Sequence, residues 1–105
     1  MVKIPAEIKT ILNNFIINLE KDNVQFDKMY LFGSYAKNQA NKNSDIDLAI
    51  VSSKFSGNPI LDNELIFNAK INASYELETH TFKSDEFDDS DPFVKEIIKT
   101  GILLT

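Results

Sequence analysis

The apolar residues near the start of the chain recur every three or four positions, which is the period of an α-helix. They form one wide stripe of Ile4, Ile8, Ile11, Leu12, Phe15, Ile16 and Leu19. A stripe of this width is typical of an amphipathic helix that packs on a core, and docking into a partner's groove is the alternative. We therefore predict a helix over residues 5–21, with Pro5 in the first turn, where its missing N–H costs nothing.

Two short apolar runs further along have the length and composition of buried strands. The first, residues 29–32, reads MYLF, and the second, LAIV at 48–51, lies within a strand predicted over 46–52. Between them, residues 34–40 are predicted to form a short helix that begins at Ser34. A polar loop then leads into the second strand.

A third strand is predicted over residues 73–82, where the side chains alternate in character. Tyr75, Leu77 and Thr79 alternate with Glu76, Glu78 and His80. Successive residues of a strand face opposite sides, so an acidic face should lie opposite a more apolar one. In a sheet open to water such a face is commonly just solvated.

Two later helices are marked by a capping residue followed by proline. Asn58 with Pro59 predicts a helix over residues 59–71, and Asp91 with Pro92 predicts another that ends at Gly101 as a C-cap. The apolar tail at 102–104 could pair at a sheet edge or meet a second subunit, so a homodimer is possible.

This order of elements predicts the fold class: an α/β (α+β) sandwich in which a small sheet is flanked by helices, with the site at one open face. With 105 residues, we expect one domain over 1–105. The periodicity does not decide whether the sheet is mixed or parallel.

Composition narrows the possible functions. The formal charge of −5 argues against tight binding to long nucleic acid, which needs a basic surface. The chain has no cysteine, so a metal would be held by oxygen ligands or by its one histidine. We find no apolar run long enough for a membrane span and no signal peptide, and we therefore expect a cytoplasmic location.

The stretch that carries candidate chemistry is residues 33–47, GSYAKNQANKNSDID. Gly33 and Ser34 follow the first strand, where a glycine permits a sharp turn and a serine can offer a hydroxyl to a phosphate. Asp45 and Asp47 begin the second strand and point to the same face, ~7 Å apart. At an effective dielectric of ~20 they repel by roughly 2 kcal/mol, which a cation between them would relieve. Mg²⁺ is the natural candidate, and a solvated turn is the alternative.

Other motifs are excluded because the chain lacks residues that they require. An EF-hand needs a further oxygen ligand and a glycine after Asp-x-Asp, but Leu48, Ala49 and Ile50 stand there. A P-loop needs a Gly-Lys-Ser/Thr ending, which is absent, and three glycines cannot form a dinucleotide fingerprint.

Glycine-serine, ten residues and then Asp-Ile-Asp resembles the signature of the nucleotidyltransferase superfamily that includes DNA polymerase beta. The small size is similar to its minimal branch, the single-domain nucleotidyltransferases often encoded beside a HEPN-domain partner. The resemblance implies a mixed sheet of the polymerase beta-like nucleotidyltransferase fold. It also implies a third carboxylate on the downstream strand.

By this resemblance, Asp45, Asp47 and Glu78 would be the catalytic and metal-binding residues, and Gly33, Ser34 and Lys42 would bind the nucleotide. Glu76 lies one pleat from Glu78 and is the alternative third carboxylate. His80 is left without an assigned role: it is a poor ligand for Mg²⁺ but could neighbour the substrate. Lys37 and Lys42 could each reach a triphosphate or be solvated.

The function implied is Mg²⁺-dependent transfer of AMP from ATP to a hydroxyl acceptor, a tyrosine on a HEPN-type toxin partner, which would make this chain an antitoxin. The alternative from another class is an inactive binding module that neutralises a partner by contact. Nucleotidyl transfer to a small molecule is a third, weaker hypothesis, because such relatives carry an additional domain.

Overall fold

The computed structural model describes residues 3–105, which form a four-stranded sheet in the order β3-β2-β1-β4. Strand β2 (Ile46–Ser52) pairs in parallel with β3 (Leu77–Lys83) and antiparallel with β1 (Lys28–Phe32). The short strand β4 (Ile102–Leu103) pairs antiparallel with β1. The sheet is therefore mixed, and the predicted fold class is confirmed.

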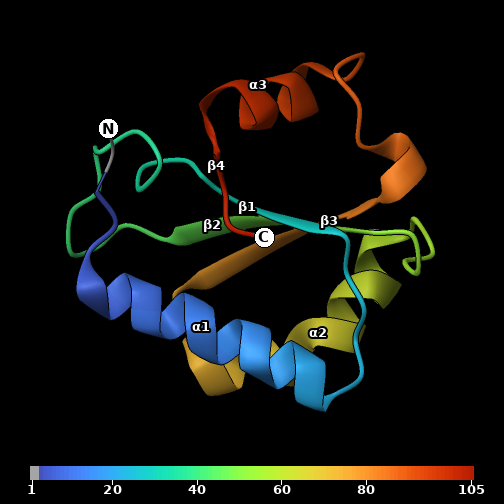
Figure 1. The fold of residues 1–105 in the computed structure, drawn as a ribbon, viewed down its shortest axis with the longest axis horizontal. Coiled ribbons are helices and arrows are strands. Elements are labelled where there is room, and N and C mark those ends of the chain that lie inside the picture. The colour runs from blue at the N-terminus through green and yellow to red at the C-terminus, as the bar shows by residue number, and fades with distance from the viewer. Residues whose placement is uncertain (1–2) are drawn as a thin grey trace.

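Three helices cover the two faces of this sheet (Figure 1). Helices α1 (Ala6–Lys21) and α2 (Pro59–Ala73) lie on one face, and α3 (Pro92–Thr100) lies on the other. The face that was predicted to be open is therefore partly covered by α3. Val94 and Ile97 of α3 are almost completely buried, because the apolar side of this helix packs on the sheet.

The main core lies between the sheet and the helices α1 and α2. The predicted stripe of α1 is confirmed as a core face, since its central side chains are buried. Each large apolar side chain that is fully buried contributes roughly 1.5–3 kcal/mol. The fully buried members of this core include Phe15, Leu19, Leu31, Leu48, Ile50 and Ile66.

The capping residues predicted for α2 and α3 are confirmed. The Asn58 side chain accepts hydrogen bonds from the amides of Ile60 and Leu61, and the Asp91 side chain accepts one from the amide of Phe93. In α1 the prediction was off by one residue, because Pro5 occupies the N-cap position and the helix begins at Ala6. The Asn58 and Asp91 side chains thus satisfy amides that have no partner within their helices.

Residues 34–40 form turns and not the predicted helix. The amides of Ala36 and Lys37 donate to the carbonyl of Gly33, and that of Gln39 donates to the carbonyl of Ser34. Asn38 then adopts a left-handed conformation, with φ of 58°, which stops the helical hydrogen-bond ladder after about one turn.

The third strand begins later than predicted, at Leu77 and not at residue 73. Helix α2 extends to Ala73, and residues 74–76 are needed to turn the chain back into the sheet. Tyr75 is consequently outside the strand and 87% exposed. The predicted alternation holds from Leu77 onward, since Leu77 is buried and Thr79 hydrogen-bonds Asn63 of α2.

The apolar tail pairs at the sheet edge, which is one of the two predicted possibilities. Leu31 is in register with Ile102, and Tyr30 with Leu103. Gly101 ends α3 as predicted, but its φ of −76° is not the left-handed value of a glycine cap. A Cβ there would lie 2.4 Å from the Ile97 carbonyl oxygen, so close packing requires the glycine.

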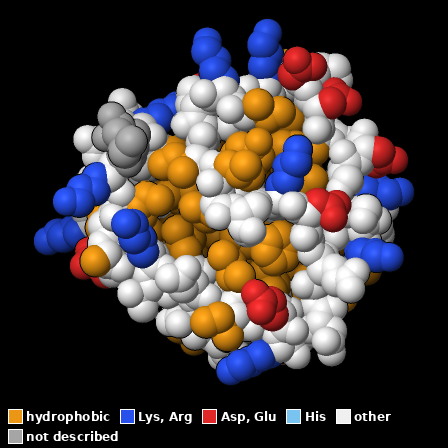
Figure 2. All heavy atoms as spheres, viewed as in Figure 1, with side chains coloured by type: hydrophobic (Ala, Val, Ile, Leu, Met, Phe, Trp, Pro, Cys, Tyr) orange, Lys and Arg blue, Asp and Glu red, His pale blue; other side chains and the backbone are white. Residues whose placement is uncertain are grey.

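Some apolar side chains stay at the surface. Figure 2 shows them in several separate patches on the face that lies between α1 and α3. Helix α2 also presents Ile60, Leu61, Leu65 and Phe67, each more than half exposed. No helix within residues 3–105 has the length and apolar character needed to cross a lipid bilayer.

Candidate active site

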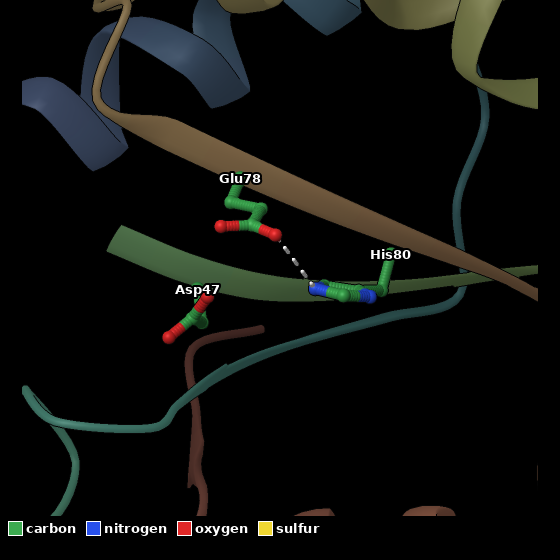
Figure 3. Close-up of side chains that lie close together, drawn as sticks. All are labelled: Asp47, Glu78 and His80. Atoms are coloured by element: carbon green, nitrogen blue, oxygen red, sulfur yellow. Dashed lines mark ion pairs between the residues drawn. The ribbon is translucent and has the colours of Figure 1, made fainter. Parts of the chain in front are cut away.

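The sheet register places Asp47 and Glu78 side by side. Asp47 of the central strand β2 is directly opposite Glu78 of β3 on one side and Phe32 of β1 on the other. Residues in register across a sheet project to the same face, which here is the α3 face. Figure 3 shows Asp47 and Glu78 approaching each other from their two strands.

His80, two residues after Glu78, joins the same group. One ligand atom from each of Asp47, Glu78 and His80 can be chosen so that all three lie within 4.8 Å of one another. The Nε2 atom of His80 is 4.0 Å from Oε1 of Glu78, and the two side chains are 34% and 54% exposed. The group is therefore compact and open to a ligand from solvent.

Gly33 packs closely against the Asp47 carboxylate. Because Phe32 is paired with Asp47, the chain leaves β1 directly beside the Asp47 carboxylate. Gly33 has a φ of +73°, and a Cβ placed on it would lie 2.3 Å from Oδ2 of Asp47. Both the backbone conformation and the contact with Asp47 therefore require glycine.

The electrostatics of Asp47 favour a bound cation. Partial burial raises the pKa of Asp47, and the neighbouring Glu78 and Asp45 raise this pKa further, while His80 opposes the effect. Keeping Asp47 ionised in the folded protein therefore costs free energy. A cation between the carboxylates would remove this cost, so the donor set fits a divalent metal ion.

The other predicted residues are not part of this group. Asp45 is exposed and immediately precedes β2, and it is not part of the three-residue group. Ser34 is half-buried in the turn that follows Gly33. Glu76 precedes β3, where its carbonyl oxygen accepts from the amide of Ile46, and it also lies outside the group.

Neither candidate lysine forms an ion pair with Asp45, Asp47 or Glu78. Lys37 pairs with Glu96 of α3 at 3.6 Å, an exposed ion pair worth at most about 1 kcal/mol. Lys42 lines a 280 Å³ surface pocket together with Tyr35 and the start of α1. The nucleotide-binding role of Lys42 therefore stays a prediction, as do the roles of the other site residues.

Comparison with known proteins identifies the family. The sequence profile described as "Polymerase beta, Nucleotidyltransferase" matches residues 14–105, which is most of the chain. The chain belongs to the polymerase beta nucleotidyltransferase family. The predicted superfamily is thereby confirmed, and nucleotidyl transfer is the activity that this membership supports.

A solved structure shows that the fold is also that of a nucleotidyltransferase. A crystal structure of a candidate nucleotidyltransferase from Sulfolobus solfataricus superposes with a TM-score of 0.60 and 17% sequence identity. The similarity covers 98% of this chain and 89% of the other. At this identity the match concerns the fold alone. No curated protein matches this chain significantly.

Two features of this candidate site go beyond what the sequence predicted. His80 was predicted to share the strand face of Glu78 and to be a possible neighbour of the substrate, and the structure also brings it beside Asp47. The contact between Gly33 and Asp47 depends on the antiparallel pairing of β1 with β2, which no local pattern reveals.

Substituting Gly33 by alanine should reduce nucleotidyl transfer by about 10²-fold or more. The added Cβ would displace the Asp47 carboxylate, and misplacing one catalytic group by an ångström is enough for such a loss. The left-handed backbone should also cost about 1–2 kcal/mol of stability.

Gly57→Ala is the matched control for this variant. Gly57 also has a positive φ, of 91°, but its Cβ would come closest to the end of the flexible Glu86 side chain, 2.9 Å from Oε1. Melting curves and initial transfer rates should show both variants destabilised and only Gly33→Ala inactive. Full activity of Gly33→Ala would contradict the proposed contact.

Proposed function

We propose that this nucleotidyltransferase moves AMP from ATP to a hydroxyl group of a protein partner in a Mg²⁺-dependent reaction. The observation that carries the proposal is the convergence of Asp47 and Glu78 beside Gly33. Asp45 stands two residues before Asp47 and would complete the set of carboxylates on the nucleotide side. A bound Mg²⁺ would neutralise negative charge that develops on the phosphates.

The turn after β1 would hold the phosphates of the nucleotide. The amides of Ala36 and Lys37 in this turn donate to the Gly33 carbonyl, as amides do in the first turn of a helix. The amide and hydroxyl of Ser34 are therefore placed like donors at the start of a helical turn, where anions bind. Glu78, which is 54% exposed, could accept the proton of the attacking hydroxyl. Lys42 could reach the distal phosphates.

A protein is the acceptor that we favour. The formal charge of −5 argues against long nucleic acid as the acceptor, because binding it requires a basic surface. The exposed apolar side chains of α2, Ile60 and Phe67 among them, offer a surface for a protein. A groove lined by these two residues also reaches Glu78. By resemblance to the minimal nucleotidyltransferases, we propose a HEPN-type toxin with a tyrosine acceptor, an antitoxin role and a cytoplasmic location.

The test is to incubate the protein with labelled ATP, Mg²⁺ and the protein encoded by the neighbouring gene. We expect the partner to gain the mass of one or more AMP groups. Asp45→Asn should abolish this gain without affecting the fold, because Asp45 is exposed and outside the sheet. If Asp45→Asn neutralises the partner equally well and no AMP is added, the chain is a binding module.

A further inference from the structure

The spacing of His80 from Glu78 points to a shared ligand between them. Nε2 of His80 and Oε1 of Glu78 are 4.0 Å apart, which is too long for a hydrogen bond. Figure 3 shows the imidazole nitrogen directed toward the Glu78 carboxylate, with Asp47 below. The gap therefore has the size of an ion that both groups contact.

The dimensions of the whole group are close to those of an octahedral cation site. Ligand atoms ~2.1 Å from one ion lie about 3.0 Å apart when adjacent and about 4.2 Å apart when opposite. The ligand atoms of Asp47, Glu78 and His80 all lie within 4.8 Å of one another. This bound is somewhat wider than the opposite-ligand spacing, so a bound ion would draw the three side chains closer together.

The imidazole is held in place by aromatic packing. The His80 ring meets the rings of Phe32 and Phe93 edge-on, at centroid distances of 5.2 Å and 5.7 Å. Phe32 is also in register with Asp47, so its ring lies on the same face of the sheet as the proposed ligands. Such support lowers the entropy cost of fixing a metal ligand.

We propose that His80 is a metal ligand and that, with Asp47 and Glu78, it makes this position select Mn²⁺ over Mg²⁺. Imidazole is a poor ligand for Mg²⁺ and a good one for transition ions, whereas carboxylates suit both Mg²⁺ and Mn²⁺. Asp45 lies outside the group and leaves the nucleotide-side position to oxygen ligands alone. This inference refines the metal site of the proposed function and rests on it.

The direct test is electron spin echo spectroscopy of Mn²⁺ bound to the protein without nucleotide and without any polyhistidine tag. The chain has a single histidine, so a ¹⁴N imidazole signal can come only from His80. We expect this signal in the parent protein and its loss in His80→Gln. Calorimetry should show a Mn²⁺ affinity about tenfold or more lower in His80→Gln, with the Mg²⁺ affinity changed less than about threefold.

Glu76→Gln is the matched control, because it removes a nearby carboxylate that lies outside the group. It should keep both the ¹⁴N signal and the Mn²⁺ affinity. Absence of the imidazole signal in the parent, or equal Mn²⁺ affinity in His80→Gln, would overturn the inference. Either result leaves AMP transfer to be judged separately, since the partner-modification experiment does not depend on Mn²⁺ binding.

Discussion

Asp47→Asn is expected to abolish nucleotidyl transfer and, at neutral pH without metal, to make the folded protein more stable. Asp47 is the central carboxylate of the site, between Phe32 and Glu78. Losing its charge should lower the transfer rate by about 10³-fold or more, since the electrostatic stabilisation of the reacting phosphates depends on it.

The gain in stability follows from the raised pKa of Asp47. Its pKa lies above the ordinary value of 3.8, so folding favours the protonated form. The stability that this provides is complete below the unfolded-state pKa and is lost as the pH rises through the folded-state pKa. At neutral pH, ionised Asp47 should therefore make the parent less stable than Asp47→Asn.

The measurement is a series of melting curves from about pH 3 to about pH 7, with and without Mg²⁺ and ATP. This range begins below the ordinary pKa of an aspartate and ends at neutrality. Without ligand, the Tm of Asp47→Asn should rise relative to the parent as the pH increases. At ~100 times Kd, Mg²⁺ with ATP should stabilise the parent by roughly 2.7 kcal/mol and the variant much less. A parent protein whose Tm does not respond to saturating Mg²⁺ and ATP would count against the nucleotide site.

Glu78→Gln should lower the transfer rate by about 10²-fold or more, whereas Glu76→Gln should stay within a few-fold of the parent. Glu78 is in register with Asp47, and Glu76 lies before the strand and outside the group. The glutamine keeps the shape of Glu78 but removes the charge and the proton-accepting oxygen. Binding of Mg²⁺ with ATP should weaken much less, because Asp45 and Asp47 remain.

The two variants should be compared by initial transfer rate at saturating ATP, with either Mg²⁺ or Mn²⁺ present. Melting curves should first establish that both fold like the parent. An inactive Glu76→Gln together with an active Glu78→Gln would show that the third carboxylate is one pleat away from the position that we assign.

Local patterns predicted most of the elements because their causes are local. The stripe of α1 and the capping residues Asn58 and Asp91 specify helices through contacts within a few positions. The failures occurred where a single residue or a distant contact overrides propensity. Asn38, in a left-handed conformation, stops the turn after Gly33 from continuing as a helix.

The buried carboxylate of Asp62 is another feature that depends on tertiary structure and not on a local pattern. Asp62 lies in the first turn of α2, where an acidic side chain is favourable even when exposed. In the structure it is 2% exposed and accepts hydrogen bonds from the amides of Ser56 and Gly57 and from the Ser56 hydroxyl. Its carboxylate thus fixes the loop before α2, a role that depends on how the loop folds back.

The sequence by itself determined the fold class and the superfamily. It also located the glycine-serine turn and the Asp-Ile-Asp motif, because their spacing from Gly33 to Asp47 is a property of the chain. Only the tertiary structure decided which side chains meet across the strands. The register of β2 with β3 places Glu78 beside Asp47, adds His80 and leaves Glu76 outside. Strand register is set by the burial of whole faces and not by the residues of the site, so a local motif cannot specify it.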